Sequence, residues 1–345
     1  MLPVTILILV LAVLFDFLNG IHDSSNIVAT MISSRAFRPA VALGVTALAE
    51  FLGPFIFGVA VAKTIAHEIV SPESITIQVL LAALISAIVW NLLTWFFGIP
   101  SSSSHALVGG LIGAVIVGAG FKAIQWNGLE KVLIALFTSP IIGLVFGFFI
   151  TKLIFFLARG ATPKINWFFR RAQILTGIVL AFSHGTNDAQ KTMGVITLGL
   201  LIAGYLSTFT VPIWVIALSA SAIALGTALG GWRLIKTLGG KFYKIRPVHG
   251  FAVQVTSALV ILGASLVGGP VSTTQVVSSA IMGVGSAERV SKVRWGVGGE
   301  IAIAWIVTIP ATALVAAGAY WLILNVPATL EWFGQLLLSL KLFFH

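Results

Sequence analysis

The sequence predicts an all-α polytopic membrane protein made of two inverted-topology repeats, with broken or re-entrant helices and about 10–12 transmembrane segments. Three observations indicate this fold class. The composition is strongly apolar, the basic residues collect in alternate polar breaks, and two motifs recur in the same order in the two halves of the chain.

The composition excludes a soluble protein. Of the 345 residues, 58% are hydrophobic and 9% are charged, and cysteine is absent. A soluble domain carries roughly 25% charged residues to cover its surface, whereas a membrane-spanning helix needs about 20 mostly apolar residues. The chain can therefore form on the order of ten spans. A soluble enzyme, a DNA-binding domain and a disulfide-stabilised secreted domain are excluded.

Short polar breaks separate the apolar segments. We expect spans at approximately 3–18, 40–62, 76–98, 105–121, 132–157, 174–203 (interrupted), 211–231, 248–268, 275–285 and 298–323. A further apolar segment at 328–344 can cross the bilayer or lie at its surface. The first segment lacks the basic start and the cleavage site of a signal peptide, so we expect it to be a retained span.

The basic residues distinguish two kinds of break. Four breaks hold 15 of the 20 Lys and Arg, namely Arg35, Arg38, Lys152, Arg159, Lys164, Arg170, Arg171, Arg233, Lys236, Lys241, Lys244, Arg246, Arg289, Lys292 and Arg294. Cytoplasmic loops are enriched in Lys and Arg. This distribution therefore puts the N-terminus outside the cell and starts the second half of the chain inside. The formal charge of +10 follows from membrane orientation and does not indicate nucleic-acid binding.

Two repeated motifs support the same division. In the first, FDFLNGIHDSSN at 15–26 aligns with LAFSHGTNDAQK at 180–191; in the second, GIPSSSSHALVGGLIG at 98–113 aligns with GGPVSTTQVVSSAIMG at 268–283. The identical pairs include Phe17/Phe182, Gly20/Gly185, Asp23/Asp188, Pro100/Pro270, Ser102/Ser272 and Gly113/Gly283. Inverted repeats whose paired motifs interrupt helices are typical of secondary transporters. We assign residues 1–158 and 173–345 to the repeats and residues 159–172 to a basic cytoplasmic linker.

The paired aspartates lie in the middle of apolar stretches. An ionisable side chain inside a span costs several kcal/mol and usually marks an ion or proton pathway. Carboxylate, amide and unwound backbone oxygens are suitable ligands for a small alkali cation. Asp23 and Asp188, with Asn26 and Asn187 nearby, therefore form the predicted cation site. Capping of a helix that restarts at each motif is the structural alternative.

Hydroxyl-rich breaks precede two of the apolar segments. The sequences SSSSH at 101–105 and VSTTQ at 271–275 are each followed by an apolar helix. A helix N-terminus presents free N–H groups and a partial positive charge. Hydroxyl and amide donors together suit a tetrahedral oxyanion, with ordinary N-capping by Ser or Thr as the alternative.

Further polar residues stand in or near these motifs. Lys191 can balance Asp188, balance a bound anion or extend to the membrane surface. Glu50 interrupts the second apolar segment and can serve cation coupling or helix packing. Three histidines also occur here: His22, His105 and His184. They can donate to an anion, relay protons or form interior hydrogen bonds.

These motifs carry a family resemblance. Over essentially the whole chain and in the right order, four segments resemble signatures of the inorganic phosphate transporter (PiT) family: NGIHDSSN, HGTNDAQKTMG, WNLLTWFFGIPSSSSHALVGGLIG and GGPVSTTQVVSSAIMGVG. The resemblance implies a multi-pass permease of the plasma or inner membrane that imports phosphate by symport with sodium or protons. It implies a lipid-embedded protein with no enzymatic activity, no cofactor and no nucleic-acid partner, and a homodimer is compatible with it.

The residues and the resemblance together give two sets of candidate site residues. The predicted phosphate-binding residues are Asp23, Asn26, Ser103, Ser104, Asn187, Asp188, Lys191, Thr273 and Thr274. The predicted sodium ligands are Asp23, Asn26, Glu50, Asn187, Asp188 and Gln254.

Two positions depart from the family pattern. Gln254, in GFAVQ, replaces the second glutamate of the segment GFxxE that many sodium-coupled relatives carry, and Gln275 replaces the histidine of STTH. The loss of a carboxylate removes a strong cation ligand. We therefore expect weaker sodium dependence, and proton coupling stays open.

Three alternative functions stay open at this point. A sulfate or other oxyanion permease of the same family would share the fold, although we expect the paired Asp motifs to be eroded in sulfate permeases. A channel would conduct without uphill accumulation. An intramembrane hydrolase built on Ser104, His105 and an aspartate is disfavoured, because one active site does not need two hydroxyl-rich breaks and two aspartates.

Overall fold

The computed structural model describes residues 2–70 and 74–325. Within these residues the chain is helical, apart from loops and an isolated β-bridge between Val70 and Ile124. The α-helices are α1 (Leu2–Ser33), α2 (Pro39–Phe57), α3 (Ala60–His67), α4 (Ile77–Phe97), α5 (Ser103–Ala119), α6 (Trp126–Leu157), α7 (Ile165–Ile202), α8 (Ile213–Leu229), α9 (Trp232–Gly240), α10 (Pro247–Leu266), α11 (Thr273–Glu288) and α12 (Trp295–Asn325). The apolar segment predicted at 328–344 lies outside the described residues.

The helices confirm a polytopic membrane protein. Among the described residues, six helices are long and apolar enough to cross a bilayer: α1, α2, α4, α6, α10 and α12. The pair α8 and α9, bent by 70°, adds a seventh if it forms one span. α5 and α11 have 17 and 16 residues. Each is too short to cross a hydrocarbon core of about 30 Å alone, because a helix rises about 1.5 Å per residue.

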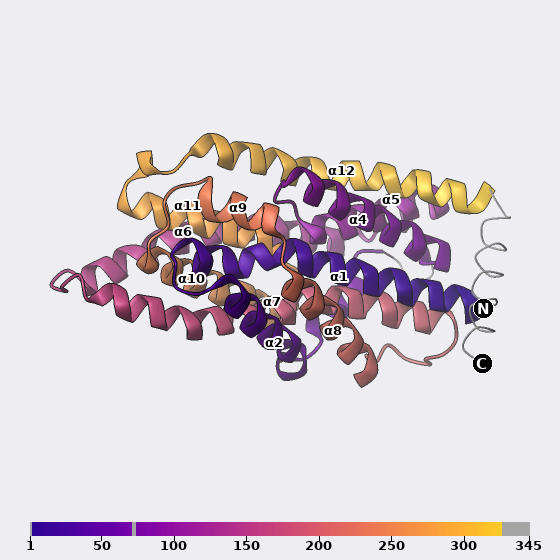
Figure 1. The fold of residues 1–345 in the computed structure, drawn as a ribbon. Coiled ribbons are helices and arrows are strands. Elements are labelled where there is room, and N and C mark those ends of the chain that lie inside the picture. Colours follow the sequence, from indigo (N-terminus) through magenta and orange to yellow (C-terminus); the bar gives the residue numbers. More distant parts are fainter. Residues whose placement is uncertain (1, 71–73, 326–345) are drawn as a thin grey trace.

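The two short helices belong to helical hairpins. The hairpin of α4 and α5 and the hairpin of α10 and α11 occupy opposite ends of the bundle (Figure 1). Their turns contain the two hydroxyl-rich breaks. These turns meet inside the bundle, where Ser104 Oγ donates a hydrogen bond to the backbone oxygen of Val271 at 3.0 Å. The hairpins are the re-entrant elements that the fold class predicted.

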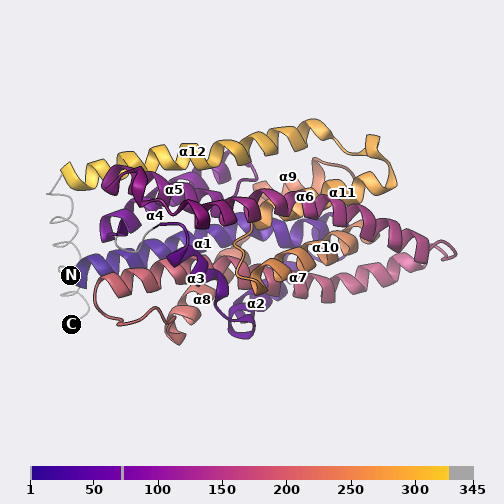
Figure 2. The same ribbon diagram turned by 180° about the vertical axis from the view of Figure 1, so that it is seen from behind.

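The two halves of the chain are intertwined. α2 packs on α7 and α8 packs on α1, while α5 lies along α12 and α11 lies along α6 (Figures 1 and 2). Every one of these contacts joins a helix of one repeat to a helix of the other. If the two repeats are exchanged, the contact of α2 with α7 becomes the contact of α8 with α1. The contact of α5 with α12 likewise becomes the contact of α11 with α6. This reciprocal packing is the structural expression of the inverted repeat.

A repeated glycine permits the close approach of α1 to α8 and of α7 to α2. A Cβ atom on Gly20 would lie 2.1 Å from the backbone oxygen of Ile223, on α8. A Cβ atom on Gly185 would lie 2.2 Å from the backbone oxygen of Glu50, on α2. Small residues allow helix backbones to pack closely in membranes, and here no larger side chain fits.

The expected interruption of the helices at the two Asp motifs is wrong. α1 continues without a break past Asp23, and α7 continues past Asp188. The motifs contain no proline, and their glycines serve helix contacts instead of opening the backbone. The breaks occur at Gly58, between α2 and α3, and at Gly230, between α8 and α9, with φ of 80° and 76°. Glycine adopts such positive φ values at little cost.

Side chains of α7 and α1 support these two breaks. Gln190 Oε1 accepts hydrogen bonds from the backbone N–H groups of Val61 and Ala62 at the start of α3, at 2.7 and 3.3 Å. Ser24 Oγ accepts from the N–H of Gly231, before α9, at 2.7 Å. Free N–H groups at a helix start need partners. The helices that carry the paired aspartates therefore also hold the broken elements in place.

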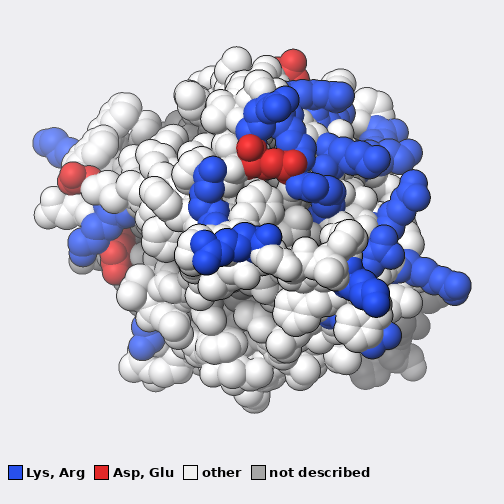
Figure 3. All heavy atoms as spheres, turned by 90° about the vertical axis from the view of Figure 1, so that its left-hand side faces the viewer, with Lys and Arg blue, Asp and Glu red and all other residues white. Residues whose placement is uncertain are grey.

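The four basic breaks lie at one end of the bundle, which we call the basic end; Figure 3 shows Lys and Arg side chains gathered there with few acidic ones. The N-terminal end of α1 lies at the opposite end (Figure 1). Since cytoplasmic loops are rich in Lys and Arg, we expect the basic end to face the cytoplasm. The segment 159–172, predicted as a linker, comprises a short loop and the first turns of α7, which begins at Ile165.

We expect Gly20→Ala to lower the unfolding temperature of the purified protein in detergent, because the new methyl group would collide with the backbone of α8. Overpacking of this kind costs about 1–3 kcal/mol. Gly44→Ala on α2 is the matched control, since a Cβ atom there meets nothing within 4 Å. Equal unfolding temperatures for the two variants would contradict the packing of α1 on α8.

Candidate functional site

Two aspartates from opposite halves of the chain lie close together inside the bundle. Asp23 on α1 and Asp188 on α7 are both buried. The hydroxyl of Thr273, at the start of α11, lies 2.9 Å from Asp188 Oδ2 and 3.2 Å from Asp23 Oδ2. The two repeated Asp motifs therefore meet, and a residue of the second hydroxyl-rich break joins them.

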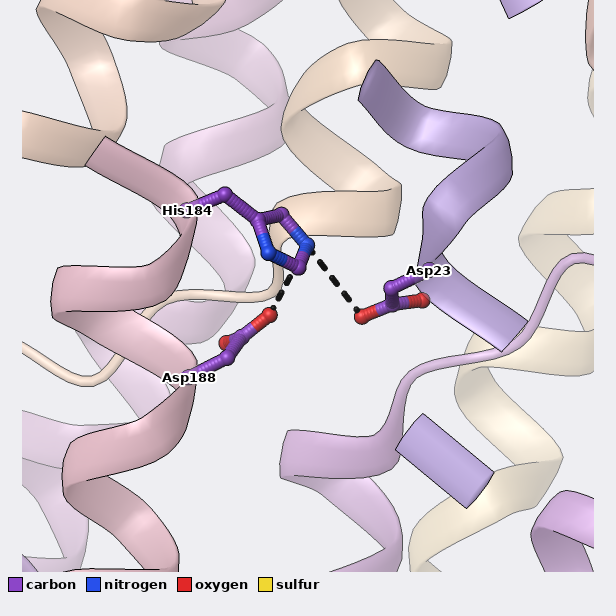
Figure 4. A group of neighbouring side chains, drawn as sticks. All are labelled: Asp23, His184 and Asp188. Atoms are coloured by element: carbon purple, nitrogen blue, oxygen red, sulfur yellow. Dashed lines mark ion pairs between the residues drawn. The ribbon is translucent and has the colours of Figure 1, made fainter. Parts of the chain in front are cut away.

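His184 is the third member of this group (Figure 4). Its Nε2 lies 3.0 Å from Asp188 Oδ2 and 3.6 Å from Asp23 Oδ2, and its Nδ1 lies 2.6 Å from Glu50 Oε1. The imidazole thus connects the carboxylate of α2 to the paired aspartates. Each ring nitrogen can form a hydrogen bond with its carboxylate in two ways: the imidazole carries a hydrogen on both nitrogens, or one of the carboxyl groups is protonated and donates to the imidazole. This part of the site can hold and exchange a proton.

The second hydroxyl-rich break combines capping and site residues. Ser272 Oγ accepts from the backbone N–H of Gln275 at 3.4 Å and caps α11. Thr274 Oγ1 donates to Asp23 Oδ1 at 2.9 Å and accepts from Asn26 Nδ2 at 3.0 Å. The capping interpretation therefore holds for the serine, while the threonines face the carboxylates.

The first break divides in the same way. Ser102 Oγ accepts from the backbone N–H of His105 at 3.1 Å and caps α5. Ser104 Oγ accepts from Lys191 Nζ at 2.6 Å. Ser103 Oγ is buried and has no hydrogen-bond partner among the described residues. A buried hydroxyl without a partner is costly, so this group is available to a ligand.

Lys191 lies inside the site and does not extend to the membrane surface. Only 1% of the residue is exposed. Its ammonium group donates to Asp188 Oδ1, to Ser104 Oγ and, at 3.1 Å, to the backbone oxygen of Val271. The predicted pairing of Lys191 with Asp188 is therefore present.

Two of the predicted ligands form their hydrogen bonds with other residues. Asn187 Nδ2 donates to Ser265 Oγ at 2.9 Å. Gln254 Oε1 accepts from Thr176 Oγ1 at 2.5 Å, and its Nε2 donates to Thr30 Oγ1 at 3.4 Å. Gln254 thus lies where α1, α7 and α10 meet, and none of its hydrogen bonds in the described part of the chain goes to a paired aspartate.

The other two histidines flank the paired aspartates. His22 Nδ1 lies 3.1 Å from Asp23 Oδ1, and its Nε2 lies 3.4 Å from Thr94 Oγ1. His105 Nδ1 pairs with Gln275 Nε2 at 3.1 Å, so the residue that departs from STTH links the two hairpins. In the described part of the chain His105 pairs with this amide, and Ser104 Oγ donates to the Val271 oxygen instead, so the Ser104–His105 pair considered for a hydrolase is not formed.

Asp16 is a buried carboxylate that the sequence analysis missed. It lies two turns before Asp23 on the same face of α1, since residues seven apart share a face. Both of its carboxylate oxygens and both polar atoms of Asn19 lack a hydrogen-bond partner among the described residues. The available signal was an aspartate inside an apolar span, but the matching position of the second half is Ala181.

The charge of the site limits its chemistry. Oxygen or nitrogen atoms of Asp23, His184 and Asp188 lie within 4.8 Å of one another, close enough to hold one cation. Hydroxyl groups and a carboxylate-bound ammonium surround this point. The arrangement suits a cation directly and an oxyanion only in the company of cations or protons.

Comparison with known proteins decides the family. The model of the phosphate transporter family matches residues 19–168 and 156–316. The chain belongs to the phosphate transporter family. It is 45% identical to a protein named a probable low-affinity inorganic phosphate transporter from Bacillus subtilis (strain 168), over 94% of this chain and 98% of that protein. A protein of the same name from Rhizobium meliloti (strain 1021) is also 45% identical, over 92% of this chain and 96% of its own length.

A solved structure agrees with this assignment to the phosphate transporter family. The structure, titled "The sodium-dependent phosphate transporter", matches with a TM-score of 0.85 and 27% sequence identity, over 93% of this chain and 98% of that one. The family resemblance predicted from the motifs is therefore confirmed. This phosphate transporter family member is a multi-pass protein of the cell membrane, and the relatives are named as transporters and not as enzymes.

We expect Asp16→Asn to stabilise the protein in detergent while reducing phosphate uptake. The substitution removes a buried carboxylate whose oxygens have no hydrogen-bond partner among the described residues. Residues that serve function at a cost in stability show such opposite effects on stability and activity. Thermal unfolding and uptake into proteoliposomes measure the two effects. Glu130→Gln, at an exposed carboxylate, is the control. A destabilised variant with normal uptake would show that Asp16 is structural.

Proposed function

We propose that this phosphate transporter family member imports inorganic phosphate by symport with sodium or protons, using alternating access to a site between the two repeats. The charge of the buried site carries the proposal. Asp23, Glu50 and Asp188 are enclosed together, and the basic groups in contact with them are Lys191, His184 and His22. Burial of uncompensated charge costs several kcal/mol. An anion therefore enters this site only with cations or protons, which couples the two fluxes.

The hydroxyl groups support phosphate as the anion. Ser103, Ser104, Thr273 and Thr274 lie at the N-terminal ends of α5 and α11, where free N–H groups and the helix dipole favour an oxyanion. Phosphate retains a proton at neutral pH and can donate it to a carboxylate, whereas sulfate has no proton to donate. Neighbouring carboxylates thus favour phosphate over sulfate by leaving sulfate oxygens facing negative charge.

The oxygen ligands support a cation beside the anion. The carboxylates of Asp23 and Asp188 and the imidazole of His184 can hold one ion, and Asn26 Oδ1 is buried without a partner among the described residues. Glu50 reaches the same point through His184. The carboxylate and amide oxygens are ligand types that sodium accepts, and the same carboxylates can take protons. The solved relative is a sodium-dependent phosphate transporter, which favours sodium, whereas Gln254 favours weaker sodium dependence.

The enclosure of the site supports alternating access. Its side chains are almost fully buried, so passage requires movement of the surrounding helices. The two hairpins reach the site from opposite ends of the bundle. A cavity of about 500 Å³, lined by Thr94, Lys241 and Glu300 among others, lies between α4, α9 and α12. Thr94, which lines this cavity, contacts His22, and His22 contacts Asp23. These polar side chains connect the site to the cavity on the side of the basic end.

The experiment that tests the proposal is uptake of labelled phosphate into proteoliposomes, with sodium and proton gradients imposed separately. We expect uphill accumulation driven by at least one gradient. Asp23→Asn and Asp188→Asn should each reduce accumulation by at least tenfold, because charge-assisted contacts contribute about 1.5–3 kcal/mol. Glu130→Gln is the matched control.

Three results would contradict the proposal. Normal accumulation in both aspartate variants would exclude the site. Phosphate flux that only equilibrates would indicate a channel. Stronger competition by sulfate than by unlabelled phosphate would indicate a sulfate permease.

Sodium dependence should increase in Gln254→Glu. The carboxylate would restore a strong cation ligand at a position already lined by the hydroxyls of Thr30 and Thr176. Phosphate uptake measured against sodium concentration at fixed pH tests this expectation, with the unmodified protein as the reference. A steep sodium dependence that the substitution leaves unchanged would show that this position does not tune coupling.

A further inference from the structure

The ammonium group of Lys191 has the surroundings of a bound cation. A lysine ammonium has three hydrogen-bond donors. All three have acceptors here: the carboxylate of Asp188, the hydroxyl of Ser104 at 2.6 Å and the backbone oxygen of Val271 at 3.1 Å. Carboxylate, hydroxyl and backbone carbonyl oxygens are also the ligands that a hard alkali cation takes. No donor of Lys191 is left over for an additional ligand.

The other repeat has no such group. The position that matches Lys191 is Asn26, whose Nδ2 donates to Thr274 Oγ1 at 3.0 Å. The Thr274 hydroxyl in turn donates directly to Asp23 at 2.9 Å. Around Asp23, the hydroxyl and the carboxylate are therefore in direct contact, and no charged group lies between them.

Around Asp188, the lysine separates the carboxylate from the matching hydroxyl. Ser104, which corresponds to Thr274, directs its hydroxyl proton to the Val271 oxygen at 3.0 Å and not to Asp188. Lys191 Nζ bonds to both Ser104 and Asp188 and thus lies between them. The two halves share their carboxylate and hydroxyl but differ in one tethered positive charge.

We propose that the Lys191 ammonium is a tethered cation that takes the place of one coupling sodium ion between Asp188, Ser104 and the Val271 carbonyl. This inference rests on the proposed symport and specifies its stoichiometry. Because this cation is tethered to the chain, the part of the site around Asp188 needs no sodium from solution. Together with Gln254 in place of a glutamate, it gives the protein fewer sodium ions per phosphate than a chain with a neutral residue at position 191.

The test counts sodium ions without using phosphate. Purified protein in detergent is titrated with radioactive sodium in equilibrium dialysis, with choline chloride keeping the ionic strength constant. Lys191→Asn, which copies the residue of the first repeat, should bind one more sodium ion per protein than the unmodified chain. Lys191→Gln serves as a second neutral variant, and Lys122→Asn, at an exposed lysine, is the matched control. An equal number of bound sodium ions in all four proteins would overturn the proposal.

Phosphate binding distinguishes the tethered cation from direct contact with the anion. At low sodium, Lys191→Asn should bind phosphate about 10- to 100-fold more weakly than the unmodified protein, with recovery at high sodium. The slope of log Kd against log sodium concentration should become steeper by about one, because linkage between two ligands is reciprocal. Equal weakening at every sodium concentration would instead indicate that Lys191 binds phosphate itself. Failure of the unmodified protein to bind phosphate would refute the proposed function, while the sodium count would still decide the role of Lys191.

Discussion

The need to compensate buried carboxylates governs the arrangement of this bundle. Asp23, Glu50 and Asp188 are removed from water, and a charged group left unpaired there is strongly destabilising. Their partners come from distant parts of the chain: Thr274 lies 251 residues from Asp23, and His184 lies 134 residues from Glu50. The positions of α1, α2, α7 and both hairpins therefore depend on one another.

Close backbone packing makes these contacts possible. At Gly20 and Gly185, helices of opposite halves approach so closely that no side chain fits between them. Polar side chains on α1 and α7 then serve two purposes. Some, such as Ser24 and Gln190, hold the broken elements, and others project into the site. Function and architecture thus share the same two central helices.

The chemistry of the site could be predicted from the sequence more fully than its geometry. Hydrophobic length and the placement of Lys and Arg are local properties, so the fold class and the inverted repeat were accessible. Internal repetition identified the paired aspartates and the hydroxyl-rich breaks. Repetition could not find Asp16, because Ala181 occupies the matching position, and no local pattern connects His184 with Glu50. The sequence alone does not distinguish a glycine that breaks a helix from a glycine that allows a second helix to pack closely. This explains the wrong expectation of broken helices at Asp23 and Asp188.

The exchange of packing partners between the halves has a consequence for synthesis. A membrane protein is inserted in order from its N-terminus, and α2 finds its main partner only when α7 has been made. Until then Glu50 lacks the imidazole of His184, and Asp23 lacks the threonines of α11. During synthesis, the first half of the chain therefore lies in the bilayer with these polar groups unpaired. It can pack around them only after the second half has been made. Neither half of the chain can therefore complete its buried polar contacts alone.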